Sequence, residues 1–174
     1  MKLADIRRKT AYNPTALATP KAQLRTWLCG KSKDYPIAIT LTLKQVVTEE
    51  TNNGLRYSKI TKNDCEKIAK RFTQKFNREV FGKRQADKYG KCLSYITVVE
   101  GERSNKHLHL HFAVGGFPKH IKYNQIDKLV NDAKNNVRNI DEQYKVDIAD
   151  SGWMEYITKE VSNKDTDNVL WTLA

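Results

Sequence analysis

Residues 93–114, LSYITVVEGERSNKHLHLHFAV, contain the pattern that decides the fold. Residues 93–100 and 107–114 are rich in β-branched, aromatic or alternating apolar residues, and the segment 101–106 between them is polar. Two strand-like runs around a short polar segment are typical of a β-hairpin. We therefore expect the two runs to pair with each other at the centre of a sheet.

Further strands and helices flank this hairpin. Residues 37–43 (IAITLTL) have the composition of a buried strand, and residues 144–149 alternate as a short strand. Apolar residues at helical spacing predict amphipathic helices over about 62–81 and about 123–138, and residues 153–161 form a third predicted helix. This order of elements predicts an α+β fold, a ferredoxin-like sandwich with a central antiparallel sheet and helices packed on it.

The remaining stretches are less regular. Residues 1–34 mix basic residues with two prolines, and only residues 21–28 have a weak helical pattern. We interpret residues 1–34 as a basic arm with one short helix, and residues 35–174 as the main domain. Residues 46–57, with Asn-Asn-Gly near their middle, predict either a hairpin or a flexible loop.

The composition indicates a globular protein with a basic surface. A chain of 174 residues is long enough to form one domain with its own core. Lys and Arg exceed Asp and Glu by 31 to 20, and this formal charge of +11 favours nucleic acid as a partner over a merely solubilising surface. Three widely spaced cysteines suggest a reducing compartment, and no segment resembles a signal peptide or a membrane span. We expect a soluble cytoplasmic protein without a membrane partner.

Three of the four histidines alternate with apolar residues in one short run. On a strand, His107, His109 and His111 share one face at intervals of about 6 to 7 Å, and the apolar residues occupy the other face. Imidazoles so arranged can converge on one divalent ion, whereas protonated imidazoles at this spacing repel each other. We interpret the row as a metal site rather than as a chance alternation on an exposed strand.

Two carboxylates lie near the histidine row. Glu100 ends the partner strand and is the preferred ligand, whereas Glu102 lies in the connecting turn, where solvation is the simpler fate. Imidazoles alone favour zinc, but an added carboxylate shifts the preference toward Mg²⁺ or Mn²⁺. We therefore expect Mn²⁺ or Mg²⁺ as the cofactor.

A tyrosine and a lysine form the second chemical feature. Tyr156 and Lys159 are three residues apart, so both side chains share one face of the predicted helix. A phenol with a pKa of about 10 is a weak nucleophile at neutral pH unless a cation, a base or geometry assists it. Lys159 would supply that cation or hold a substrate phosphate. A half-buried tyrosine beside a surface lysine is also a common structural pair.

Taken in order, three segments resemble the rolling-circle replication initiators of the HUH endonuclease superfamily. Residues 38–42 (AITLT) are similar to the first motif of these initiators. His109-Leu110-His111 is similar to their His-hydrophobic-His motif, and Tyr156-Ile157-Thr158-Lys159 to their catalytic Tyr-x-x-Lys. The resemblance spans residues 37–160. Conjugative relaxases of the same superfamily place the tyrosine before the histidines, so the order here argues against them.

The chain departs from the initiator pattern at two points. His107-Leu108-His109 competes with His109-Leu110-His111, so only His109 belongs to both registers. We rank His111 above His107 because the apolar flanks of the motif surround it. No tyrosine lies four residues from Tyr156, so this is the single-tyrosine form.

The resemblance implies a metal-dependent nickase and strand transferase. Glu100, His109 and His111, with His107 as the competing ligand, would hold one Mg²⁺ or Mn²⁺. Tyr156 would attack the scissile phosphate of single-stranded DNA or of an origin hairpin. The products would be a 5′-phosphotyrosine link and a free 3′-OH, and the reverse reaction would join ends without ATP.

Four other residues receive supporting roles from this resemblance. Lys159 would position a phosphate or stabilise the transition state, and Thr40, Thr42 and Lys106 would contact the nucleic acid. Because the sequence contains no phosphate-loop motif, unwinding would fall to a separate helicase.

Two other functions compete with the initiator. A single-strand transposase of the HUH type shares the order of the motifs, but the Thr-Leu-Thr strand and Lys159 favour the initiator. A non-catalytic nucleic-acid-binding module would account for the basic charge but not for the histidine row.

Overall fold

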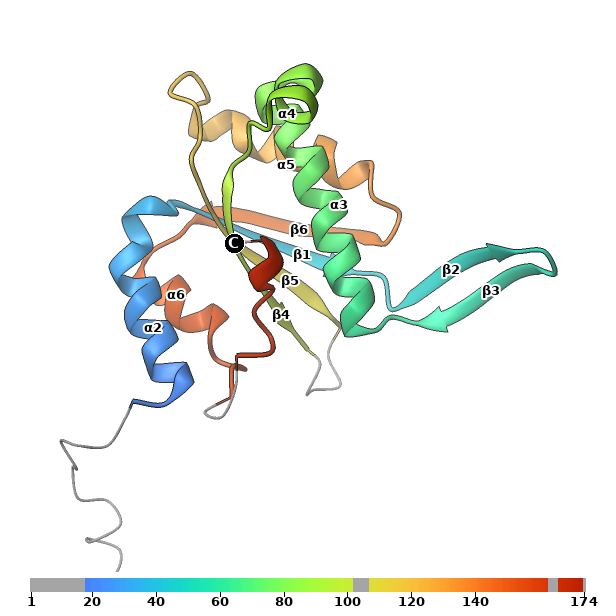
Figure 1. Cartoon of the computed structure of the whole chain (residues 1–174), viewed down its shortest axis with the longest axis horizontal. Helices are drawn as coiled ribbons and strands as arrows, with labels where there is room; N and C mark the ends of the chain where they lie inside the picture. Colours follow the sequence, from blue (N-terminus) through green and yellow to red (C-terminus); the bar gives the residue numbers. More distant parts are fainter. Residues whose placement is uncertain (1–17, 102–106, 163–165, 174) are drawn as a thin grey trace, which may run out of the picture.

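The structure is a computed structural model, which describes residues 18–101, 107–162 and 166–173. Its central elements are β1 (Ile37–Leu43), α3 (Lys62–Phe81), β4 (Ser94–Glu100), β5 (His109–Gly115), α5 (Tyr123–Asn135) and β6 (Ile140–Ile148). The four strands pair in the order β4-β5-β1-β6, and all neighbours are antiparallel. Along the chain, α3 connects β1 to β4 and α5 connects β5 to β6 (Figure 1). The predicted ferredoxin-like α+β fold is confirmed.

Helices α3 and α5 cover one face of the sheet. Leu110 and Phe112 point toward this face from β5 and are buried in the larger hydrophobic core. The rings of Phe112 and Phe72 of α3 have their centroids 5.2 Å apart. Helix α3 begins at a capping box: the Thr61 hydroxyl accepts from the Asp64 N–H at 3.3 Å, and the Asp64 carboxylate accepts from the Thr61 N–H at 2.9 Å.

The opposite face carries a smaller layer. Helices α2 (Pro20–Lys31) and α6 (Ser151–Ile157) lie side by side on it (Figure 1). Leu24 and Leu28 of α2 and Met154 of α6 are buried in a second hydrophobic core with apolar residues of the sheet. Because this core joins α6 to the sheet, it determines where the side chains of α6 lie over the strands.

The predicted hairpin forms, but only one of its strands is central. Strand β5 lies between β4 and β1, whereas β4 lies at the edge of the sheet. A later segment covers this edge: the Val99 N–H donates to the Asn168 carbonyl, and the Leu170 N–H donates to the Thr97 carbonyl, both at 2.8 Å. An edge strand that is covered in this way is protected from pairing with other chains.

Several boundaries differ from the predicted ones. Strand β5 begins at His109 instead of residue 107, and β6 begins at Ile140 instead of residue 144. Helices α5 and α6 end at Asn135 and Ile157, so Lys159 lies beyond the end of its predicted helix. The final turn of a short helix contributes little hydrogen bonding, and tertiary contacts decide where it ends.

The remaining elements flank the sandwich. Strands β2 (Val46–Thr51) and β3 (Gly54–Lys59) form a hairpin that extends away from the main sheet (Figure 1), so the hairpin alternative is correct. Helix α4 (Lys83–Tyr89) was not predicted, and it follows Gly82, whose φ of 81° ends α3. Two short 3-10 turns, η1 (Ser32–Asp34) and η2 (Trp171–Leu173), complete the described elements.

Candidate active site

The candidate site lies on the sheet face that α6 covers. Across the antiparallel register, Thr40 of β1 is opposite His111 of β5, and Thr42 is opposite His109. Glu100 of β4 is opposite His109 from the other side. Residues opposite each other in antiparallel strands point to the same face. The register therefore places all five side chains beneath α6.

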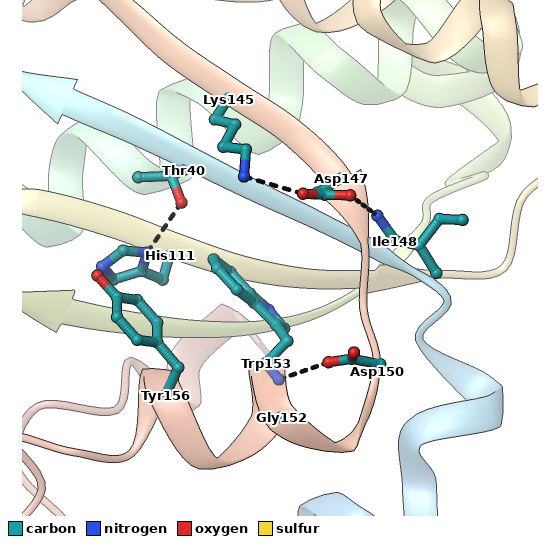
Figure 2. A pocket seen from close by; sticks show the side chains of 9 residues that line it. All are labelled: Thr40, His111, Lys145, Asp147, Ile148, Asp150, Gly152, Trp153 and Tyr156. Atoms are coloured by element: carbon teal, nitrogen blue, oxygen red, sulfur yellow. Dashed lines mark hydrogen bonds and ion pairs between the residues drawn. The ribbon is translucent and has the colours of Figure 1, made fainter.

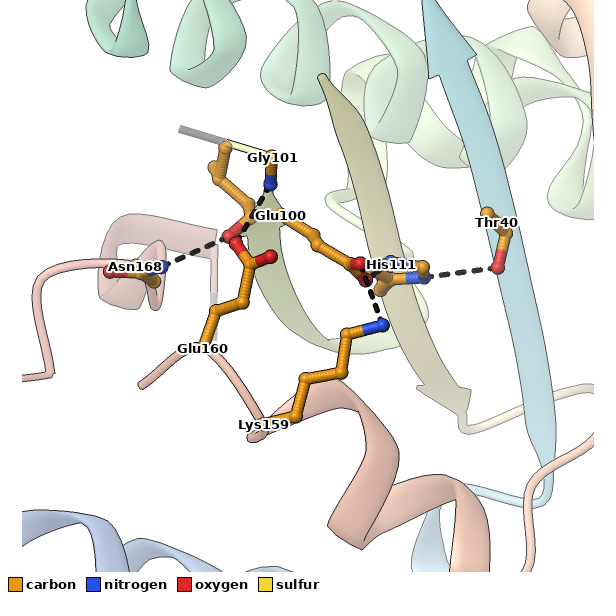
Figure 3. A network of polar contacts seen from close by, with 8 residues as sticks. Thr40, Glu100, Gly101, His111, Lys159, Glu160 and Asn168 are labelled. Carbon is orange, nitrogen blue, oxygen red and sulfur yellow. Dashed lines mark hydrogen bonds and ion pairs between the residues drawn. The ribbon is translucent and has the colours of Figure 1, made fainter. Parts of the chain in front are cut away.

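His111 is the centre of the polar network. Its side chain is almost fully buried, and its two ring nitrogens have different partners (Figure 3). Nδ1 is 3.0 Å from the Thr40 hydroxyl, and Nε2 is 2.6 Å from the Glu100 carboxylate. Because an ionised carboxylate only accepts hydrogen bonds, Nε2 carries the proton in this arrangement. Thr40 and Glu100 together determine the orientation of the imidazole.

Glu100 joins His111 to Lys159. Its second oxygen is 2.6 Å from the Lys159 ammonium, and the carboxylate is buried. Burial by itself would raise the pKa of Glu100, but the hydrogen bonds and positive charge of His111 and Lys159 outweigh it and lower the pKa from 4.5 to about 2. Glu100 therefore stays ionised at neutral pH and holds two potential cations together.

Gly101, the residue after Glu100, fixes the end of strand β4. The Gly101 N–H donates to the Glu160 carboxylate at 2.9 Å (Figure 3). Gly101 has a φ of 100°, and a Cβ at this position would lie 2.6 Å from the His107 carbonyl oxygen. Only glycine fits both the conformation and the space. The strand end that carries Glu100 is thereby tied to the turn that carries Lys159.

Tyr156 and Lys159 approach each other as predicted, but for a different local reason. Helix α6 ends at Ile157, and the Lys159 N–H donates to the Tyr156 carbonyl at 3.0 Å in the following turn. This turn places the Lys159 ammonium 3.7 Å from the centre of the Tyr156 ring. Burial would lower the pKa of Lys159, but interactions with Glu100 and Tyr156 outweigh it and raise the pKa. Lys159 is therefore a firmly charged cation beside the phenol.

Tyr156 lies between this network and solvent. Its ring is 5.5 Å from that of His111, and 44% of the residue is exposed. Figure 2 shows the side chain extending from α6 toward His111. The tyrosine is thus accessible to a substrate and adjacent to a network in which Glu100 and His111 are buried and Lys159 is partly exposed.

The other predicted metal and DNA ligands differ in how far they are buried. The His109 ring is half-buried and nearly parallel to that of His111 at 6.2 Å, and burial and the nearby His111 lower the pKa of His109. Thr42 is buried on the same face. His107 is exposed and precedes β5. Lys106, like the alternative carboxylate Glu102, lies outside the described residues.

The donor set fits a hard or borderline divalent ion in its chemistry, although the side chains are not arranged around one. Among the described residues, no three His, Cys, Asp or Glu side chains form a group that could hold a metal ion as they stand. Glu100 contacts His111 Nε2 and Lys159, and the His109 ring lies 6.2 Å from that of His111. These donors, the His109 and His111 imidazoles and the Glu100 carboxylate, would suit Mn²⁺ or Mg²⁺ in their chemistry.

Helix α2 supports the site in a way that the sequence did not indicate. Arg25 Nε donates to the Thr158 hydroxyl at 2.8 Å, and the Lys21 ammonium donates to the Lys159 carbonyl at 2.7 Å. Both contacts hold the turn that carries Lys159. The weak apolar spacing of Leu24 and Leu28 was the only signal that α2 packs on the sheet.

Comparison with known families places these residues in context. Residues 36–165 match the family model of the replication-associated protein ORF2. The chain belongs to this family. The match runs from the start of β1 to beyond α6, so Thr40, Tyr156 and Lys159 are all inside it, whereas α2 precedes it. No curated protein and no solved structure matches the chain.

Membership in the replication-associated ORF2 family indicates a role in the replication of a replicon, and hence an interaction with DNA. In the part of the chain that the structure describes, no helix is long and apolar enough to cross a membrane.

Proposed function

We propose that this member of the replication-associated ORF2 family nicks and rejoins single-stranded DNA through Tyr156, and that it thereby starts rolling-circle replication in the manner of a single-tyrosine HUH endonuclease. One observation carries the proposal: an accessible tyrosine lies beside the buried pair of His111 and Glu100 and beside Lys159, which is ion-paired with Glu100. Reactive sites combine an exposed nucleophile with buried, oriented charges in this way.

The reaction requires one bond to form and one to break. The Tyr156 phenol oxygen bonds to the scissile phosphorus and gives up its proton to solvent, while the bond from phosphorus to the 3′ oxygen breaks. The departing 3′ oxygen takes up a proton and becomes a free 3′-OH, which a polymerase can extend. The 5′ phosphate stays on Tyr156 as a phosphodiester of similar energy, so the reverse reaction joins ends without ATP.

Lys159 has two tasks in this scheme. Its ammonium lies against the Tyr156 ring, so it favours the developing phenolate and the negative charge of the phosphate in the transition state. Its ion pair with Glu100 holds it in place. Preorganised charge of this kind loses little energy to reorientation during the reaction.

His109, His111 and Glu100 would hold the Mn²⁺ or Mg²⁺, with His107 as the alternative ligand. When bound, the ion would act as a Lewis acid toward the scissile phosphate. Thr40 would orient His111 through Nδ1, since a partner on one imidazole nitrogen fixes which nitrogen faces the metal.

The partners follow from charge and from what the sequence lacks. The formal charge of +11 supports binding of a single strand or an origin hairpin inside the cell that carries the replicon. The sequence has no phosphate-loop motif, so we propose that a separate helicase unwinds the DNA.

The decisive test is the Tyr156→Phe variant, which removes the attacking oxygen and preserves the ring contacts. Wild-type protein incubated with origin DNA and Mn²⁺ should form a protein-DNA adduct that survives denaturing electrophoresis and disappears with protease. The variant should bind the same DNA and form no adduct. Tyr144→Phe, on β6, is the control that should retain the adduct. An adduct that persists in Tyr156→Phe would refute the proposal.

A further inference from the structure

An open pocket extends from the candidate site toward β6. Its volume is about 740 Å³, which lies within the range of pockets that hold small organic ligands. Figure 2 shows the side chains that line it: Thr40, His111, Lys145, Asp147, Ile148, Asp150, Gly152, Trp153 and Tyr156. Three of these residues belong to the site already described, and the others form a wall with no role in the reaction.

Trp153 lines the pocket beside Tyr156. Its indole is stacked on the Tyr156 ring, with centroids 5.5 Å apart and an angle of 23° between the planes. In Figure 2, Trp153 stands between Tyr156 and the wall formed by Ile148 and Asp150. Ile148 ends β6 and is 63% exposed. A flat aromatic surface and an exposed aliphatic side chain therefore line the same cavity.

The polar groups of this wall do not suit a phosphate. Asp147 and Asp150 are two carboxylates, Lys145 is the one ammonium in the lining, and Lys145 is paired with Asp147 at 2.9 Å. A phosphate would meet a net negative wall, whereas the cation that suits it, Lys159, is not part of this lining and lies beside Tyr156. A nucleobase carries no charge, and its edge both donates and accepts hydrogen bonds, so Lys145 and Asp147 match it.

We infer that this pocket binds one unpaired base of the DNA strand, next to the phosphate at Tyr156, with Trp153 as the stacking surface. The inference rests on the proposed function for the placement of the phosphate. It adds the form of the substrate: the nucleotide beside the cut is unstacked from its neighbours and held in the pocket. Stacking of a base on an aromatic side chain is tolerant of sequence, because every base has a flat face.

The test compares two probes with the same number of phosphates. One is a fluorescein-labelled oligodeoxythymidylate, and the other is an abasic oligomer of equal length. Affinities are measured by fluorescence anisotropy at fixed salt in EDTA, so that binding is measured without cleavage. Wild-type protein should bind the thymidylate more tightly, and Trp153→Ala should reduce that preference roughly 5-fold or more. The affinity of Trp153→Ala for the abasic probe should stay as in the wild type.

Three further variants secure the interpretation. Trp153→Phe keeps an aromatic ring and should retain part of the preference, and Ile148→Ala, at an exposed position, should lower it without affecting folding. Tyr89→Ala removes an exposed aromatic ring from α4, outside the pocket, and should leave the preference unchanged. If Trp153→Ala and Ile148→Ala keep the wild-type preference, or if they weaken both probes equally, the inference is wrong.

The result is separable from the nicking reaction. A preference that depends on Trp153 in a protein that forms no adduct would overturn the nicking proposal and leave the pocket standing. A normal adduct with a preference independent of Trp153 would overturn the pocket alone.

Discussion

The charge network makes a quantitative prediction about acid stability. Glu100 has a pKa of about 2 in the folded protein and about 4.5 when unfolded. Each unit of difference corresponds to about 1.4 kcal/mol, so ionised Glu100 contributes roughly 3 kcal/mol to the free energy of unfolding at neutral pH. Between these two pKa values, the unfolded chain binds the proton and the folded protein does not. The contribution is therefore complete above about pH 4.5 and is lost as the pH falls toward 2.

The measurement is urea unfolding at pH 7 and at about pH 3, in EDTA, for the wild type and for Glu100→Gln. The linkage relation gives a loss of about 2 kcal/mol from Glu100 by pH 3. The wild type should therefore lose about 2 kcal/mol more than Glu100→Gln between the two pH values, because the amide does not titrate. The exposed Glu142→Gln is the matched control, and it should behave as the wild type does. Equal losses in the wild type and in Glu100→Gln would show that the Glu100 carboxylate is not held by His111 and Lys159 as described.

Three further predictions concern the metal, the second core and the DNA. Adduct formation should stop in EDTA and return with Mn²⁺ or Mg²⁺, and full activity in chelator would contradict the metal site. His111→Ala should abolish the metal-dependent reaction, whereas His107→Ala should not. Leu28→Ala should lower the free energy of unfolding by about 2 to 5 kcal/mol, because Leu28 is fully buried. Thr26→Ala, on the exposed side of α2, should change it by less than about 0.5 kcal/mol. Thermal or urea unfolding measures both variants, and equal effects would mean that α2 does not pack on the sheet. Affinity for a single-stranded oligonucleotide should fall by orders of magnitude between low and moderate salt, and a flat salt profile would point away from a nucleic-acid partner.

Much of the fold was readable because its signals are local. The composition of residues 37–43 and the alternation in residues 107–114 identify the strands β1 and β5, and the helical spacing over about 62–81 identifies α3. The period of side chains along one element is a property of that element alone. For the same reason, the sequence already places His109 and His111 on one face of a strand.

Other features depended on contacts between distant segments. Strand β4 lies at the edge of the sheet, and residues 168–170 cover its outer side. The turn after α6 is held by distant segments, because the Thr158 hydroxyl accepts from Arg25 and Lys159 pairs with Glu100. No local pattern records such pairings, since their free energy exists only when both segments are in place.

In the candidate site, too, some features follow from the sequence and others from tertiary contacts. The amino-acid sequence by itself determined which residue types are available, with Tyr156 and Lys159 three positions apart and His109 and His111 two apart on a strand. Only the tertiary structure decided that Lys159 pairs with Glu100 and that Trp153 forms one wall of a pocket with residues of β6. The spacing of residues in a helix or strand follows from fixed backbone geometry. The contact between Glu100 and Lys159 requires the sheet, α6 and α2 to pack around a shared core, and that packing is a cooperative property of the whole chain.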